Sequence, residues 1–281
     1  INFLELLRGG GTDYVVGVNS FVSSTNGTCL QGGFSGRISA AQTWVEGYIA
    51  GTGGTGGTGG TGGTGGMPPC TGELPVSTTI PVRVRDFSDS HPDFEDFIDD
   101  DKGIVEGELG PDQKPVYGPH ASTATTTGKA AFDQWYRDVP GVNLGIDLVL
   151  PFAPIVGGQS FVDDTFFPID GLLLGNEGRE HNFHFTVEAH TTFRYQGGER
   201  FVLEGDDDLW VFLDRRLAID LGGVHGAESG QVNVDDWAKI LGMELGGVYP
   251  LDLFFAERHT SASDLRIQLL GFQICPGATG Q

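Results

Sequence analysis

Three consecutive aspartates mark the stretch of this sequence with the clearest chemical potential. Asp206, Asp207 and Asp208 stand directly before residues 209–212, an apolar and aromatic run that predicts a β-strand. Adjacent carboxylates repel one another at neutral pH, and confining them at the start of a strand costs free energy unless water or a cation compensates. Carboxylate oxygens are the ligands that Ca²⁺ prefers. The stretch therefore predicts a Ca²⁺ site, and the competing interpretation is a solvated acidic turn between strands.

Two aromatic side chains and a charged triplet bear on this predicted site. His225, in a glycine-rich segment, follows the acidic strand by a turn, where it either leans over the aspartates or only hydrogen-bonds within its own loop. His225 and Trp210 are our candidates for contacting a bound ligand. The Glu-Arg-His triplet at 257–259 is the main competitor of a metal, because an ion pair with Asp206 or Asp208 would remove the need for one.

Three histidines between residues 181 and 190 raise the question of a zinc site. In an extended strand the six residues from His184 to His190 span roughly 20 Å at about 3.3 Å per residue, so one ion cannot contact both. Strand alternation instead assigns the side chains to two faces, namely Phe183, Phe185, Val187 and Ala189 on one and His184, Thr186, Glu188 and His190 on the other. A half-buried strand explains this segment better than a zinc site does.

No catalytic arrangement stands out in the sequence. There is no Gly-x-Ser-x-Gly, no phosphate-cradling glycine loop, no His-Glu-x-x-His and no cysteine beside a convincing histidine. Pairs of acids are so frequent in so acidic a chain that nothing selects a glycosidase dyad. We therefore predict that the chain is not an enzyme, with a surface polysaccharide hydrolase as a remote alternative.

The composition narrows the class of partner. With 16 Lys and Arg against 38 Asp and Glu, the formal net charge of the 281-residue chain is -22, which repels nucleic-acid phosphates and anionic lipid and favours cations. No apolar run approaches the roughly 20 residues that span a bilayer, and no signal peptide is visible at Ile1, as expected for the mature form of a secreted protein. We predict an extracellular or cell-surface protein with no nucleic-acid partner and no membrane span.

The three cysteines leave one over if two of them pair in an oxidising compartment. Cys70 and Cys275 stand just outside the two ends of the main domain, and a disulfide that joins those ends is our preferred pairing. A bridge from Cys29 to Cys70 is the alternative. The triplet Asn26-Gly27-Thr28 also fits an N-glycosylation acceptor, whose use depends on the host.

The chain divides by composition into three parts. Residues 1–50 carry apolar patches, of which 14–18 predicts a strand, whereas 37–49 fits either a helix or an extended run. Residues 51–70 are Gly-Thr-Gly repeats ending in Met-Pro-Pro-Cys, which is a linker composition; a collagen-like or polyglycine bundle is the alternative, although the repeat lacks proline. About fifty residues do not easily form a core alone, so the N-terminal segment needs a partner. Residues 71–281 are the main domain.

The main domain predicts an all-β fold, an antiparallel β-sandwich or flattened barrel with one short helix. Its many β-branched and aromatic residues and its glycine-rich turns favour this class. The helix is expected between Thr127 and Val139, with Ala131 and Trp135 on one face. Strands are expected at 80–84, 145–150, 182–192, 200–203, 209–214, 217–220, 247–256 and 264–274.

Several long motifs in this domain carry a family resemblance. They are Val84-Arg85-Asp86-Phe87 with His91-Pro92-Asp93-Phe94, Phe167-Pro168-Ile169-Asp170-Gly171, His181-Asn182-Phe183-His184-Phe185-Thr186, GDDDLWVFLDRRLAIDLGGVHG at 205–226 and LDLFFAERHTSASDLRI at 251–267. Together they look like the fibro-slime domain, which resembles a branch of the protective-antigen type β-sandwich shared by anthrax protective antigen and flocculin adhesins. The resemblance covers most of residues 80–274 and none of residues 1–70.

The resemblance implies a secreted, cell-surface or slime-associated protein. In the lectin branch, two neighbouring aspartates joined by a cis peptide hold Ca²⁺, and the cation takes the sugar hydroxyls. That pair maps onto Asp206 and Asp207 or onto Asp207 and Asp208, and the later asparagine ligand maps onto Asn233, which no motif secures. A non-proline cis peptide costs several kcal/mol and persists only where metal or packing enforces it.

These features predict, first, a structural protein: a secreted subunit of an extracellular filament or surface layer. It would polymerise with copies of itself, its N-terminal segment donating strands to the next copy while the sandwich faces outward. The alternative is a Ca²⁺-dependent carbohydrate-binding adhesin whose partners are extracellular glycans. The two functions are compatible, because a filament can carry a lectin domain.

Overall fold

The computed structural model describes residues 2–9, 12–20, 78–95 and 97–275 of the chain. The chain separates into two compact units, Ile1–Gly65 and Gly66–Gln281, and each is described by itself. Within the described residues, helices are few and short and strands dominate, so the predicted all-β class is confirmed.

The first unit contains a two-stranded antiparallel sheet. Strand β1 (Asn2–Gly9) pairs with β2 (Thr12–Ser20), and the register shifts by one residue between Glu5 and Leu6. The strand predicted at 14–18 is confirmed as the centre of β2. The ambiguous segment 37–49 and the repeat linker 51–70 lie outside the described residues.

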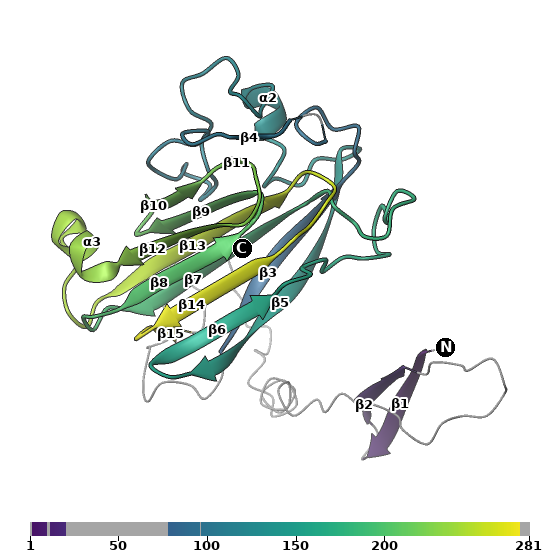
Figure 1. Cartoon of the computed structure of the whole chain (residues 1–281). Helices are drawn as coiled ribbons and strands as arrows, with labels where there is room; N and C mark the ends of the chain where they lie inside the picture. The colour runs from purple at the N-terminus through teal and green to yellow at the C-terminus, as the bar shows by residue number, and fades with distance from the viewer. Residues whose placement is uncertain (1, 10–11, 21–77, 96, 276–281) are drawn as a thin grey trace, which may run out of the picture. The chain divides into compact units, whose positions relative to one another are not determined.

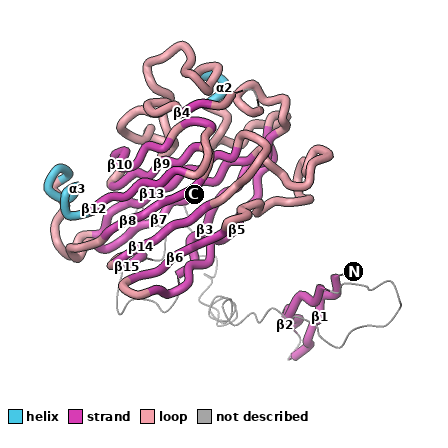
Figure 2. Tube along the Cα trace, viewed as in Figure 1, coloured by secondary structure: helices cyan, strands magenta, loops and turns pink. Residues whose placement is uncertain are grey.

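The second unit is a sandwich whose strands all pair antiparallel in the described residues (Figures 1 and 2). The strands are β3 (Thr78–Phe87), β4 (Asp99–Asp100), β5 (Asn143–Ile155), β6 (Gly158–Asp163), β7 (Phe185–Arg194), β8 (Arg200–Gly205), β9 (Asp208–Leu213), β10 (Arg216–Leu221), β11 (Gly223–Val224), β12 (Glu228–Asn233), β13 (Val248–Glu257), β14 (Leu265–Leu270) and β15 (Gln273–Cys275). One layer, here the first sheet, runs in the order β10-β9-β13-β7-β3-β5, and the second sheet runs β6-β14-β8-β12. The two sheets join where the last residues of β5 turn to pair with β6.

The main core lies between the two sheets. Period-two alternation points apolar side chains of β3, β7 and β13 inward, where they meet those of β8 and β14. Val187, Leu253 and Leu203 represent the three strands at the centre of this contact, and all are buried. Packing of this area supplies most of the stabilisation, because burial of apolar surface is the main favourable term in folding.

A third layer, residues 88–142, covers the outer face of the first sheet and is built mainly of loops (Figure 2). Its aromatic residues form a second core with Trp210, Phe212 and Phe254, which the first sheet points away from the sandwich interior. No local pattern in the sequence predicts this layer. As a result the polar face of β7, predicted to be exposed, is buried as well.

The helix expected between Thr127 and Val139 is much shorter in the structure. Helix α2 spans only Lys129–Phe132, and turns follow it. Side-chain packing accounts for the difference: the Trp135 indole donates to Asp93 (3.1 Å) and sits under the guanidinium of Arg258, which draws the chain away from a regular helix. A second helix, α3 (Val234–Leu241), was missed, although Val234, Trp237, Ala238 and Leu241 have helical spacing.

All the predicted strands of the main domain are present, with shifted ends. The run 264–274 is split into β14 and β15 at Gly271, whose φ of 76° is a left-handed conformation that ends the first strand. Strands β6 and β12 were not predicted, because Gly158, Ser160, Ser229 and Gly230 weaken the strand signal in each.

Candidate functional site

The three aspartates lie where the chain passes from one sheet to the other. Strand β8 of the second sheet ends at Gly205, and β9 of the first sheet begins at Asp208. A second crossover runs from the end of β13 to the start of β14 at the same end of the sandwich, since Ala256 pairs with Asp208 and Leu265 pairs with Gly205. The two registers therefore bring the aspartates beside residues 257–264.

Asp208 is fully committed to protein partners. Its Oδ2 accepts a hydrogen bond from Nε of Arg258 at 2.5 Å, and its Oδ1 accepts one from the Gly223 amide at 2.8 Å. Both side chains of the ion pair are 0% exposed. The sequence suggested such an ion pair as the alternative to a bound metal, and the structure contains it at one of the three aspartates.

Arg258 also ties the third layer to the sandwich. Its Nη1 donates to the carbonyl oxygens of Asp93 (3.1 Å) and Thr125 (2.7 Å), and its Nη2 donates to the Thr125 hydroxyl (3.0 Å). The guanidinium lies 4.6 Å from the centre of the Trp135 ring, within cation–π range. A buried arginine with this many partners is a structural clamp.

Glu257, the neighbour of Arg258, has the opposite environment. Its side chain is buried, with 1% of the residue exposed, and neither carboxylate oxygen makes a hydrogen bond of normal geometry. Burial raises its pKa well above the usual range, and Asp207 and Asp206 raise it further, although Ser263 and the His259 amide lie near enough to lower it. Glu257 is thus a buried acid beside two other acids without a cation of its own.

Asp206 and Asp207 each accept a single backbone hydrogen bond. Asp206 accepts one from the Asp264 amide and Asp207 one from the Arg258 amide, both at 2.8 Å. Burial raises the pKa of Asp207 to about 7 and also raises that of Asp206. For Asp207, Arg258 opposes the shift while Asp208 and Asp206 add to it. Each carboxylate keeps further acceptor capacity.

Three more buried polar atoms around these acids lack hydrogen-bond partners. They are Nε2 of His225, the hydroxyl of Ser263 and Oδ1 of Asp264. Burial raises the pKa of Asp206 and of Asp208, and His225 opposes both shifts. The Nδ1 of His225 hydrogen-bonds the carbonyl oxygen of Gly226 at 2.9 Å, which is the contact within its own loop that the sequence offered as the alternative. We call the group Asp206, Asp207, Glu257, Asp264, Ser263 and His225 the acidic end.

Two predicted site residues lie elsewhere. Asn233 pairs with Arg200, whereas Glu228 at the opposite end of β12 pairs with Gly205, so Asn233 is about 16 Å along the strand from the aspartates at roughly 3.3 Å per residue. It is not positioned to share a cation with them. Trp210 is 0% exposed, and its indole donates to Asp220, so it belongs to the second core and does not face a ligand.

The described residues contain no cis peptide bond and no cluster of three or more His, Cys, Asp or Glu side chains arranged to hold a metal ion. The lectin-type aspartate pair is therefore absent in its cis form. The acidic end supplies oxygen ligands of the right type for Ca²⁺, together with unpartnered buried oxygens, but these are not drawn into a preformed cage.

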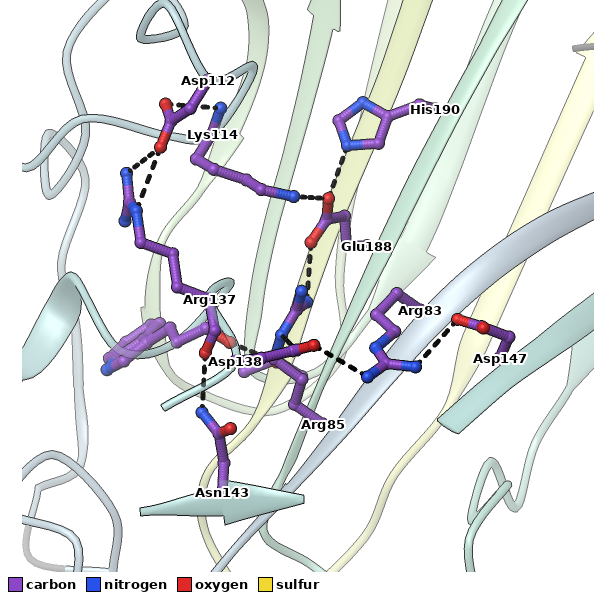
Figure 3. Close-up of polar contacts among 12 residues, drawn as sticks. Arg83, Arg85, Asp112, Lys114, Arg137, Asp138, Asn143, Asp147, Glu188 and His190 are labelled. Carbon is purple, nitrogen blue, oxygen red and sulfur yellow. Dashed lines mark hydrogen bonds and ion pairs between the residues drawn. The ribbon is translucent and has the colours of Figure 1, made fainter. Parts of the chain in front are cut away.

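The polar face of β7 carries a second buried network, shown in Figure 3. Glu188 accepts hydrogen bonds from Arg85 (2.7 Å) and His190 (2.6 Å) and also contacts the ammonium of Lys114. Burial and the nearby Arg85 lower the pKa of Lys114 to about 8, while Asp112 and Asp138 act the other way. The other ring nitrogen of His190 bonds Asp252 at 2.7 Å.

His184 is held in a similar way, between Glu177 (2.9 Å) and Glu95 (2.6 Å). The alternation predicted for this strand is confirmed, but the half-buried description is wrong because the third layer covers the polar face. Each of these histidines has acids as partners. The spacing of His184 and His190 along the strand still argues against a shared zinc ion. Both histidines instead hydrogen-bond carboxylates.

Cys275 is disulfide-bonded. Cys29 and Cys70 lie outside the described residues, so the preferred pairing with Cys70 stays a prediction. No helix among the described residues is both long enough and apolar enough to cross a membrane.

One family model matches part of the second unit. Residues 169–272 match the PA14 domain. The matched PA14 region runs from just before β7 through β14 and includes both crossovers that form the acidic end. It agrees with the protective-antigen type of sandwich that the motifs implied, whereas the fibro-slime name itself stays a prediction.

The chain also has curated relatives. It is 43% identical over 182 residues to protein psiD of Dictyostelium discoideum, covering 59% of this chain and 35% of that protein. It is 38% identical over 206 residues to protein psiR of the same organism, covering 66% of this chain and 20% of that protein. The chain thus spans about a third or less of these relatives' length.

Among solved structures, a PA14 sugar-binding domain from an RTX adhesin aligns with 14% identity and a TM-score of 0.26, covering 40% of this chain and 70% of that one. A likeness of that size carries no argument about what this chain binds.

Proposed function

We propose that this chain is an extracellular carbohydrate-binding protein whose PA14 region holds Ca²⁺ at the acidic end. The observation that carries the proposal is Glu257, a fully buried carboxylate whose two oxygens make no hydrogen bond of normal geometry and which lies beside two further acids. A buried charge of this kind is costly unless a proton or a cation compensates it. The adjacent Arg258 is already paired with Asp208.

Ca²⁺ would be held by Asp206, Asp207 and Glu257. Each of these has acceptor capacity left after its protein contacts, and the backbone bonds of the two aspartates hold their side chains at the sheet crossover. When bound, Ca²⁺ supplies open coordination positions that sugar hydroxyl oxygens can fill.

The test is calorimetric titration of Ca²⁺ into chelator-treated protein, followed by glycan-array binding with and without chelator. Wild type should bind Ca²⁺, and Glu257→Gln should lose that binding together with any chelator-sensitive glycan signal. Glu204→Gln is the matched control, since Glu204 lies on β8 beside the site but is half-exposed and paired with Arg266. Equal Ca²⁺ binding by wild type and Glu257→Gln would refute the proposal.

Self-assembly is the second candidate function, and one observation favours it. Strands β1 and β2 pair with each other in a two-stranded antiparallel sheet. An isolated two-stranded hairpin is marginally stable in water, so it gains from adding to another sheet. We infer that the chain polymerises into a filament or surface layer by donating strands of this hairpin to the next copy.

Electron microscopy of the full chain, compared with a chain lacking residues 1–20, tests the second function. Filaments or layers that need residues 1–20 support it, and monodisperse particles from both chains contradict it. That the chain is not an enzyme stays a prediction, for which turnover assays against polysaccharides are the check.

A further inference from the structure

Strand β5 leaves one edge of the first sheet without a partner. Its residues 143–152 pair with β3 on one side, and only residues 153–155 pair with β6 on the other. Along residues 143–152, no described strand pairs with the edge of β5 that faces away from β3. An edge of this kind presents a row of free backbone donors and acceptors that can pair with a further strand.

The inner face of β5 is progressively uncovered along the same edge. Phe152 and Leu150 are buried in the main core, Leu148 and Ile146 are only partly buried, and Leu144 is 45% exposed. The cause is the bend to the second sheet, because β6 covers only the far end of β5. The core is therefore open beside residues 144–148, and one more strand would close it.

The edge also carries little of what usually prevents strand addition. Natural edge strands are protected by lysines, prolines, bulges or inward-pointing charges. Here the charge between Leu144 and Leu150 is Asp147, which is paired with Arg83 at 3.1 Å, and Pro151 stands at the end of the open stretch. Val149 on the outer face is 57% exposed.

We propose that residues 144–150 of β5 are the acceptor site for a strand of the N-terminal hairpin of a second copy of this chain. The inference deepens the second candidate function and rests on it. The proposed occupant is a strand of the hairpin formed by β1 and β2, which pair with each other in a two-stranded sheet.

Charge favours the N-terminal hairpin of a second copy over any strongly acidic surface of that copy as the segment that binds to β5. The chain as a whole carries -22, and two such bodies repel one another. Residues 1–20 hold one arginine, Arg8, against two acids, Glu5 and Asp13, so the hairpin is close to neutral. Strand addition gains affinity from main-chain hydrogen bonds and specificity from alternate side chains, which here would fill the opening beside Ile146 and Leu148.

Sedimentation velocity on the full chain and its variants tests the acceptor. Val149→Lys places a charge on the open edge and should weaken association about tenfold or more, equivalent to ~1.4 kcal/mol. Leu144→Lys at the other end of the edge should act alike. Ile240→Lys is the control, because Ile240 is 73% exposed on α3, outside the first sheet, and its association should equal that of wild type.

The outcomes separate the acceptor from the proposed function beneath it. Thermal unfolding first verifies that the lysine variants are folded. If deletion of residues 1–20 abolishes association while both β5 variants associate like wild type, the acceptor lies elsewhere and the inference fails, although strand donation survives. A wild type that is monomeric at all concentrations overturns both. If the protein is monomeric and Val149→Lys makes the hairpin more sensitive to proteolysis, the edge of β5 binds the hairpin of the same chain. That result would overturn the assignment to a second copy.

Discussion

Glu188 and Glu257 are two buried glutamates on neighbouring strands, and their carboxylates have opposite electrostatic environments. Strand β7 carries Glu188 and β13 carries Glu257, and the two strands pair along their whole length. Glu188 has three cationic or imidazole partners, whereas Glu257 has no hydrogen bond of normal geometry. The charge of Glu188 is compensated by its partners (Figure 3), whereas Glu257 lies beside two other acids, Asp206 and Asp207.

Strand alternation explains how the two environments arise so close together. Glu188 points to the outer face of the first sheet, where the third layer supplies Lys114 and β3 supplies Arg85. Glu257 follows the inward row of Leu253 and Phe255, so its carboxylate faces the sandwich interior. Arg258, the next residue, turns to the outer face and pairs with Asp208. A glutamate and an arginine adjacent in sequence therefore do not neutralise each other.

The largest expected effect comes from breaking the compensated network. Glu188→Gln removes the charge that Arg85, Lys114 and His190 share, and it should lower the free energy of unfolding by about 3–5 kcal/mol, as expected when one member of a buried ion network is lost. Urea unfolding monitored by tryptophan fluorescence measures this. Asp147→Asn is the control, because Asp147 is an exposed member of the same group and should change stability little. Equal losses in the two variants would contradict the assignment.

The same substitution at the second glutamate should have the opposite sign. In chelator at pH 7, Glu257→Gln removes an acid that is ionised in the unfolded chain, whereas burial keeps it protonated in the folded chain. The substitution should therefore raise the free energy of unfolding by about 1 kcal/mol or more. Added Ca²⁺ should stabilise wild type and leave the variant unchanged. A variant less stable than wild type in chelator would show that Glu257 is satisfied by the protein.

The pH dependence of the metal-free protein sharpens this second prediction. Because burial raises the pKa of Glu257 and that of Asp207, the folded chain keeps protons that the unfolded chain releases above roughly pH 4. Stability in chelator should therefore fall as pH rises from there toward about 7, the pKa of Asp207. Asp86, with a pKa of about 6, adds to the same slope in wild type and variant alike. Glu257→Gln should make the slope shallower, and an unchanged slope would count against the acidic end.

Much of the sandwich was predictable from local patterns, while the partners at the site were not. The alternation of apolar and polar residues from Phe183 to His190 gave the correct faces of β7, because strand geometry alone decides it. The burial of its polar face depends on a loop layer some 50 to 100 residues earlier in the chain, which no local pattern reveals. Likewise, the sequence drew attention to Asp206, Asp207 and Asp208, yet only the registers of β12 and β13 exclude Asn233 and bring in Glu257.

The smallest expected effect concerns a third arginine–carboxylate group, which lies on the surface near the acidic end. Arg266 on β14 pairs with Asp164 (2.8 Å) and Glu204 (3.0 Å), but its side chain is 44% exposed. Arg266→Ala should therefore cost less than ~1 kcal/mol, and the loss should shrink further at high salt. Chemical denaturation at two urea series, one in low and one in high sodium chloride, measures both. A loss as large as that of Glu188→Gln would mean that exposure does not separate these networks, and the contrast between compensated and uncompensated burial would lose its physical basis.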